Sequence, residues 1–191
     1  MRPRDDQKIP QLFTATLGLV AKVGLSGLTV PQLAKASKVA TGTVYVYFKD
    51  KDDLINALYR EVKYRFQDAF FAGFDPSRPV KESLRKLWDH GLRYMAAHYE
   101  EQIFLQQYSI SPYRRADDMT AYAQKMMAPL RDILRAGQEQ GLVKSDKERL
   151  IVPLLMGFMS QAAEAARHDP SLLGKAALDK SFRFFWDAIK E

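Results

Sequence analysis

The chain has 191 residues, of which 47% are hydrophobic and 27% charged, and it contains no cysteine. These proportions exclude an intrinsically disordered chain, and without cysteine there is no disulfide and no thiolate metal site, so we expect a cytoplasmic protein. The net charge of +6 lies mostly in residues 1 to 60, which hold nine Lys/Arg against five Asp/Glu. A basic N-terminal end favours an anionic partner such as nucleic acid or a membrane surface.

Apolar residues recur at helical spacing through almost the whole chain, and no alternating run predicts a strand. We therefore expect an all-α protein of about nine helices. In the first helix Leu12, Thr16 and Leu19 share one face, and Gly24 stands where a left-handed C-terminal cap is typical. The longest apolar run, residues 150 to 159, is too short to cross a bilayer, so we expect no membrane association.

Two short helices are predicted next, over residues 30 to 37 and 41 to 48. Thr29 and Gln32 have the spacing of a capping box at the start of the first, which we expect to break at Lys38. Asp50 caps a fourth helix that extends to about residue 71. Prolines and glycines divide the remainder into helices over residues 80–98, 101–110, 116–139, 146–168 and 171–190.

The two short helices and their turn form the arrangement in which the second helix enters a DNA major groove while the first spans the backbone. Five residues of this second helix are small or carry hydroxyl groups, where an ordinary amphipathic helix would use Lys, Glu or Ala: Thr41, Gly42, Thr43, Tyr45 and Tyr47. Such a helix can approach a partner closely, and Gly42 is easier to understand if its backbone lies against phosphates or base edges. We interpret it as a recognition helix for double-stranded DNA.

At this point the sequence resembles the TetR family of bacterial transcription regulators. The resemblance covers about 45 residues: Gly24-Leu25, Thr29-Val30 and the stretch from Leu33 to Leu54, LAKASKVATGTVYVYFKDKDDL. It implies a helix-turn-helix domain in residues 1–50 and a ligand-binding and dimerisation domain in residues 51–191. Two residues depart from the family pattern, in which glycine is usual at Lys38 and a serine cap is usual at Ala40.

Individual DNA-binding roles are also implied by this resemblance. Thr41, Gly42 and Thr43 are expected to face base edges, where a threonine can contact a base or a thymine methyl group. Four further residues are expected to contact phosphates: Thr29, Tyr45, Tyr47 and Lys51. Their hydroxyl, phenol and ammonium groups can each donate to a phosphate oxygen and so position the protein without reading sequence. We interpret Val44 and Phe48 as core.

The second half is expected to bind a small effector, because the resemblance implies a cavity between its helices and the sequence there is rich in aromatic residues and methionine. An ordinary core explains the same residues. The candidates are Trp88, Tyr94, Met95, Phe104, Tyr108, Tyr122, Met126 and, as a polar residue among alanines, Glu164. No catalytic motif and no histidine spacing typical of a metal site is present, so we expect no enzyme activity, cofactor or metal.

The last two helices carry more apolar residues than a terminal hairpin normally needs, which indicates self-association. The candidate dimer residues are Phe158, Ala162, Ala166, Phe182, Phe185 and Ile189. A two-fold dimer would place two recognition helices on a palindromic operator. The sequence thus predicts a bacterial repressor released from DNA by a small, mostly apolar or aromatic effector. The alternative is a helical small-molecule binding protein without DNA-binding activity.

Overall fold

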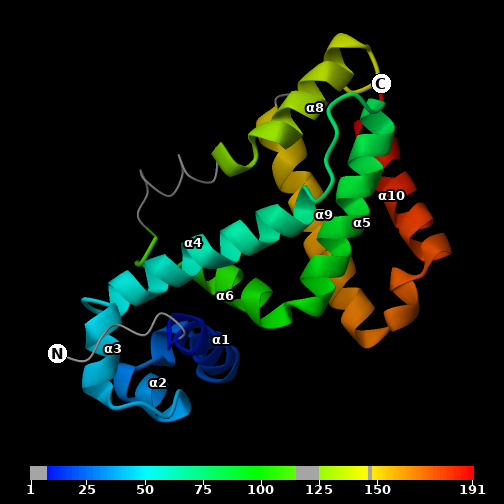
Figure 1. Cartoon of the computed structure of the whole chain (residues 1–191). Helices are drawn as coiled ribbons and strands as arrows, with labels where there is room; N and C mark the ends of the chain where they lie inside the picture. The colour runs from blue at the N-terminus through cyan, green and yellow to red at the C-terminus, as the bar shows by residue number, and fades with distance from the viewer. Residues whose placement is uncertain (1–7, 115–124, 146–147) are drawn as a thin grey trace. The chain divides into compact units, whose positions relative to one another are not determined.

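The computed structural model describes residues 8–114, 125–145 and 148–191, and these contain nine α-helices, one 3-10 helix and no strand (Figure 1). The predicted all-α fold is confirmed. The elements are α1 (Lys8–Gly27), α2 (Val30–Ala36), α3 (Thr41–Tyr47), α4 (Lys51–Phe70), α5 (Val80–Ala97), α6 (Tyr99–Ser109), α8 (Ala128–Glu139), α9 (Glu148–His168), η1 (Pro170–Leu173) and α10 (Lys175–Ile189). Residues 116 to 124 of the helix expected over 116–139 lie outside the described residues.

The chain divides into two compact units, one of residues 1–63 and 100–119 and the other of residues 64–99 and 120–191. This division differs from the expected boundary between residues 50 and 51. The first 13 residues of α4 pack with α1 to α3, and α6 joins them although it follows α5 in the chain. The first unit is therefore larger than a three-helix reading of residues 1–50.

The first unit is built around the buried face of α1. Leu12, Leu17 and Val20 are buried there, and they pack with apolar side chains of α2, α3, α4 and α6. By length and hydropathy α1 is also apolar enough to cross a membrane, but this apolar face belongs to the core of the unit. Gly24 has a φ of 76°, the positive value predicted for it, although its ψ of 163° is extended and one more turn of helix follows.

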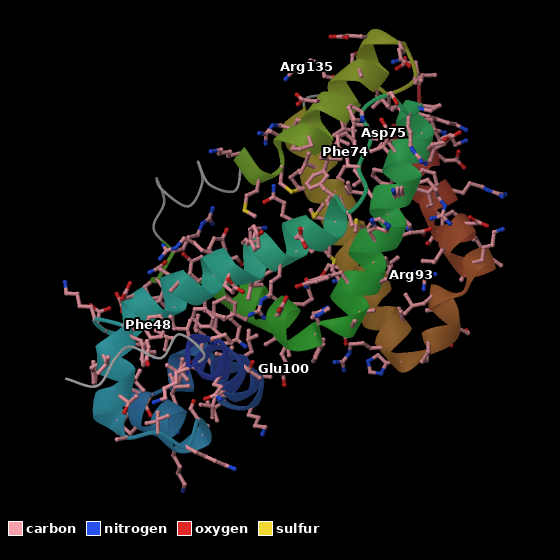
Figure 2. All side chains as sticks on the ribbon, viewed as in Figure 1. Phe48, Phe74, Asp75, Arg93, Glu100 and Arg135 are labelled. Atoms are coloured by element: carbon pink, nitrogen blue, oxygen red, sulfur yellow. The ribbon has the colours of Figure 1, made fainter. Side chains whose placement is uncertain are left out.

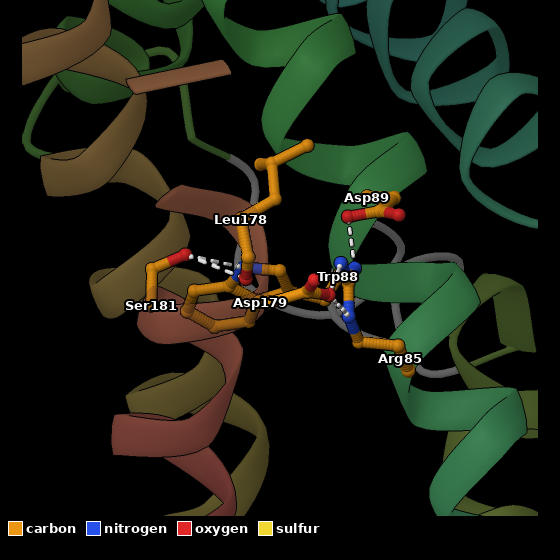
Figure 3. Close-up of polar contacts among 6 residues, drawn as sticks. All are labelled: Arg85, Trp88, Asp89, Leu178, Asp179 and Ser181. Carbon is orange, nitrogen blue, oxygen red and sulfur yellow. Dashed lines mark hydrogen bonds and ion pairs between the residues drawn. The ribbon is translucent and has the colours of Figure 1, made fainter. Parts of the chain in front are cut away.

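The second unit packs α5 against α8, α9 and α10. Trp88 is fully buried, its ring stacks on Phe185 with centroids 5.4 Å apart, and its indole nitrogen donates to the Ser181 hydroxyl over 3.0 Å. Arg85 donates to Asp89 in the next turn of α5 and to Asp179 of α10, the latter over 2.6 Å (Figure 3). These contacts fix α10 along α5.

Candidate DNA-binding face and effector pocket

Helix α2 starts and stops where the sequence predicts. The Thr29 hydroxyl accepts the Gln32 amide, and the Gln32 side-chain oxygen accepts the Thr29 amide over 3.0 Å, which completes the capping box. At the other end Lys38 N donates to Lys35 O over 3.2 Å, and Val39 N donates to Ala34 O over 3.0 Å. This pair of bonds is a Schellman turn with Lys38, at φ 55°, in the left-handed position.

Helix α3 has only seven residues and is held by one buried side. Val44 is 2% exposed and the following Phe48 is 5% exposed, with its ring 5.7 Å from that of Phe13. Both were predicted to be core. The N-cap Ala40 makes no side-chain hydrogen bond, so packing supplies the stability that a serine or threonine cap would otherwise add, about 1 kcal/mol.

The opposite side of α3 is exposed, and its residues form one continuous arc because residues i, i+1, i+4 and i+5 are neighbours around a helix. The arc consists of Thr41, Gly42, Tyr45 and Val46, with Thr43 half-buried at its edge. A β-carbon on Gly42 would meet no atom within 4 Å. Packing in this chain therefore does not require glycine at that position, and a close approach by a partner would explain it.

Val46 is a residue of this arc that the sequence reasoning missed. Its side chain is 60% exposed, and that of Tyr45 is 55% exposed. An aliphatic side chain in a short helix is normally assigned to the core. Its position two residues after Val44 places it on the opposite side of the helix and could have indicated that it is exposed. That inference requires knowing that the Val44 side of α3 is the buried one.

The four residues expected to contact phosphates are placed unequally. Thr29 and Tyr45 are exposed, although the Thr29 hydroxyl takes part in the capping box. Tyr47 is 8% exposed and belongs to the core of the unit, which leaves it little surface for another contact. The Lys51 ammonium donates to Leu25 O over 3.4 Å and lies 5.4 Å from the centre of the Tyr113 ring. Lys51 therefore also links the start of α4 to the end of α1.

The predicted effector residues divide between the cores of the two units. Phe104 and Tyr108 of α6 lie in the core of the first unit, and the Tyr108 hydroxyl donates to the Asn56 side chain over 2.8 Å. Trp88 and Met95 lie in the core of the second unit. These four residues are all large and mostly apolar because each helps to fill one of the two cores. The single effector cavity that the resemblance implied stays a prediction.

Of the remaining candidates, Tyr94 packs against the same core as Trp88 and Met95. Met126 is buried at 5% exposure, and Tyr94 is half-buried with its ring stacked on that of His98 at 3.9 Å. Glu164 is partly exposed on α9, 3.6 Å from Arg167 and 3.4 Å from His168, so a surface ion pair with Arg167 accounts for it. Tyr122 lies outside the described residues.

An open pocket of about 460 Å³ is present elsewhere in the second unit, between the loop that precedes α5 and the helix α8. Phe74 lies in this loop, next to Asp75 (Figure 2). The loop is ordered by Asp75, whose pKa is held below its usual range by hydrogen bonds from the Ser77 hydroxyl and amide. The pocket is lined by Phe74, Pro76, Arg78, Val80, Ser83, Ala128, Pro129, Asp132, Ile133, Ala136 and Gln140. Its size lies in the range of small-molecule sites.

The predicted dimer residues divide into exposed and buried ones. Phe158 is 45% exposed and Ala162 is half-buried. The others fill the core of the second unit or are buried at its edge, and so offer a partner almost no surface: Ala166, Phe182, Phe185 and Ile189. The exposed apolar residues that the prediction missed are Leu150 and Leu154 of α9, at 60% and 54%, and Phe184 of α10, at 61%.

Among the residues that the structure describes, no group of three or more His, Asp or Glu side chains is placed to hold a metal ion. What the first unit does provide is a short exposed helix, fixed by a capped neighbour and presenting hydroxyl groups. This is the geometry of a helix-turn-helix DNA-binding protein.

Comparison with known proteins agrees with this class and identifies the family. Residues 12–58 match the family model described as bacterial regulatory proteins of the tetR family, and residues 79–190 match the tetracyclin repressor-like C-terminal domain. The chain belongs to the TetR family, a family of transcriptional regulators rather than enzymes.

The relatives with similar sequences are regulators too. An uncharacterized HTH-type transcriptional regulator of Haemophilus influenzae is 38% identical over 88 residues, which is 46% of this chain and 47% of the relative. The HTH-type transcriptional regulator BetI of Cronobacter sakazakii is 34% identical over 77 residues, 40% of this chain and 38% of BetI. The chain thus spans less than half the length of either relative.

Solved structures match over the full length. A TetR family transcription regulator from Marinobacter aquaeolei is 25% identical, with a TM-score of 0.88 and coverage of 100% of both chains. A TetR-family transcriptional regulator from Haemophilus influenzae is 26% identical, with a TM-score of 0.82 and the same coverage.

Proposed function

We propose that the chain is a homodimeric repressor of the bacterial cytoplasm that binds a palindromic operator and is released from it by a small effector. The observation that carries this proposal is the exposed arc of α3. Its hydroxyl-bearing side chains and Gly42, where packing leaves the space open, suit a helix that enters a major groove. A helical binding protein without DNA-binding activity would have no use for such an arc.

The roles within the arc follow from chemistry. Thr41, Gly42 and Thr43 face the bases, and Val46 adds an apolar surface suited to a thymine methyl group. Tyr45 donates to a phosphate, and Thr29, Tyr47 and Lys51 make further phosphate contacts. These contacts position the protein without reading sequence. The exposure of Tyr45 supports its part in this division, while the burial of Tyr47 restricts any phosphate contact there to the edge of its side chain.

Dimerisation is supported by an apolar stripe on α9. Leu150, Leu154 and Phe158 follow one another at intervals of four residues and are all exposed, which places them on one side of the helix. Gly157 lies beside them, and a β-carbon there would meet no atom within 4 Å. Phe184 adds to the exposed apolar surface of the unit from α10. Burial against a second copy would remove this surface from water.

For the effector, the pocket between the α4–α5 loop and α8 supports a small and mostly apolar molecule. Phe74, Val80 and Ile133 provide apolar walls, while Arg78 and Gln140 provide polar groups. The Arg78 guanidinium pairs with Asp75 at 3.8 Å. Effector binding and DNA binding must oppose each other by the same factor, because the coupling between two sites is reciprocal.

The test is selection of bound oligonucleotides from a random pool with the purified chain, followed by titration of the selected sequence. We expect enrichment of an inverted repeat bound by two copies of the chain. Recovery of no preferred sequence, with binding that is equal for all DNA, would contradict the proposal. Once a candidate effector is in hand, equal affinity for it with and without operator would contradict the release mechanism.

A further inference from the structure

Lys38 has an unusual backbone conformation. It has a positive φ, 55°, and in the described part of the chain the other residues with positive φ are Gly24, Gly73 and Gly141. A side chain is disfavoured in this region because its β-carbon crowds the backbone. Glycine would therefore be the residue that best fits the Schellman turn after α2, and the presence of lysine there requires a reason beyond folding.

The surroundings of Lys38 suggest that reason. Lys38 lines an open groove of about 890 Å³ between the first turns of α1 and the turn that joins α2 to α3. Both charged residues of the lining are lysines, Lys8 and Lys38, and the polar ones include Gln11, Thr14 and Thr43. No carboxylate of the described residues lines it, so the groove is an electropositive concavity, which favours an anion.

The groove adjoins the recognition helix. Thr43 lines the groove and also borders the exposed arc of α3. DNA docked on the arc would carry its phosphates past the rim of the groove, within the reach of a lysine side chain. A free phosphate ion carries the same negatively charged oxygens as the DNA backbone. Because the groove is continuous with the exposed arc of α3, the phosphates of DNA are the favoured occupant.

We propose that this groove is a DNA phosphate site in which the Lys38 ammonium is the principal cation and Lys8 the second. The proposal rests on DNA binding by α3, as proposed above. It adds a contact at the turn between the two helices, and it explains why a lysine occupies a left-handed position. Release of one condensed counterion per neutralised phosphate gives this contact a measurable salt dependence.

The decisive variant is Lys38→Gly, because glycine adopts the required φ freely while the ammonium is lost. We expect thermal stability to be unchanged or raised. The slope of the logarithm of the DNA association constant against the logarithm of the salt concentration should fall in magnitude by about 0.9 for each bound copy. At 0.15 M salt this corresponds to roughly five-fold weaker DNA binding per copy. Lys38→Arg keeps the charge and should retain the wild-type slope.

The matched control is Lys22→Ala, which removes an exposed lysine of α1 that does not line the groove. Its salt slope should equal that of the wild type. If Lys38→Gly binds the selected operator with wild-type affinity and slope, the groove is not a phosphate site, although DNA binding by α3 stands. If the wild type shows no DNA binding, both proposals fail.

Free phosphate as the occupant is tested by titrating inorganic phosphate into the DNA-free protein while following the backbone amide signals of Lys38 and Thr43. We expect no saturable change at millimolar phosphate, because a single phosphate ion lacks the docking that α3 supplies. Saturation, combined with an unchanged salt slope for Lys38→Gly, would overturn the proposal in favour of a free-phosphate site.

Discussion

The side-chain oxygen of Gln107 in α6 accepts the backbone amide of Leu25, with 2.5 Å between the two atoms. Leu25 is 3% exposed and follows Gly24, where the positive φ turns the chain. On the other side of the same residue, Leu25 O accepts from Lys51. Both polar groups of this buried backbone unit are thus satisfied by side chains from α6 and α4, which ties the end of α1 into the first unit.

Replacing Gln107 by alanine should therefore lower the stability of the first unit. The buried amide of Leu25 would lose its acceptor, which destabilises by about 1–3 kcal/mol. Chemical denaturation followed by circular dichroism measures this difference. The neighbouring Gln106 is exposed, so Gln106→Ala is the matched control and should change stability by less than about 0.5 kcal/mol. Equal stabilities of the two variants would contradict the assigned role.

Tyr45→Phe should weaken operator binding by roughly 1.5–3 kcal/mol, the range for hydrogen bonds to charged groups. Because the lost partner is a phosphate, the loss should be similar on operator and on unrelated DNA. Thr43→Ala should instead change the preferred sequence at one base position of each half-site. Fluorescence anisotropy on the selected operator and its single-base variants measures both effects. Wild-type behaviour of both variants would show that α3 is not the recognition helix.

Substitutions at two adjacent phenylalanines of α10 should distinguish residues needed for dimerisation from residues needed for folding. Phe184 is 61% exposed and Phe185 is 0% exposed. Phe184→Asp places a charge in the proposed interface and leaves the core intact. Sedimentation velocity should therefore show a monomer, and this monomer should still unfold cooperatively on heating. Phe185→Ala should reduce the free energy of unfolding by about 3–5 kcal/mol, since it empties part of the core. A dimer as tight as the wild type in Phe184→Asp would place the interface elsewhere.

The ion pair between α5 and α10 predicts a pH effect. The hydrogen bond from Arg85 holds the pKa of Asp179 below its usual value. The unfolded chain, with a pKa near 3.9 for this carboxyl, therefore binds the proton more readily than the folded chain. The stabilisation is present above that value and is lost as the pH falls through the folded pKa.

In Asp179→Asn the free energy of unfolding should accordingly fall less steeply than in the wild type as the pH is lowered from about 5. Urea denaturation at a series of pH values measures this dependence. The size of the effect is limited by solvent, because the side chain of Asp179 is 47% exposed. In an Arg85→Gln background the same substitution should flatten the profile less, because Lys175 and Arg183 are then the remaining cations that lower the pKa of Asp179. An equal flattening in both backgrounds would assign the pH dependence to those two cations and not to Arg85.

Local chemistry decided what could be predicted from the sequence of this protein. The capping box of Thr29 and Gln32, the positive φ of Gly24 and the break at Lys38 involve residues within a few positions of one another, so short-range rules suffice to place them. The all-α class and the two short helices α2 and α3 followed from local sequence patterns for the same reason. The core positions Val44 and Phe48 were predictable because they are large apolar residues four positions apart, the first in α3 and the second directly after it.

Only the tertiary structure decided which apolar residues are inside. Phe184 and Phe185 are chemically identical neighbours, yet α10 turns one outward and the other into the core. Phe104 and Tyr108 were grouped with Trp88 by composition, but α6 packs in the first unit. Burial is set by contacts between residues far apart in the chain, and composition does not encode them. A short element such as a capped turn is therefore determined by its own residues, whereas a surface or a pocket is determined by the packing of helices.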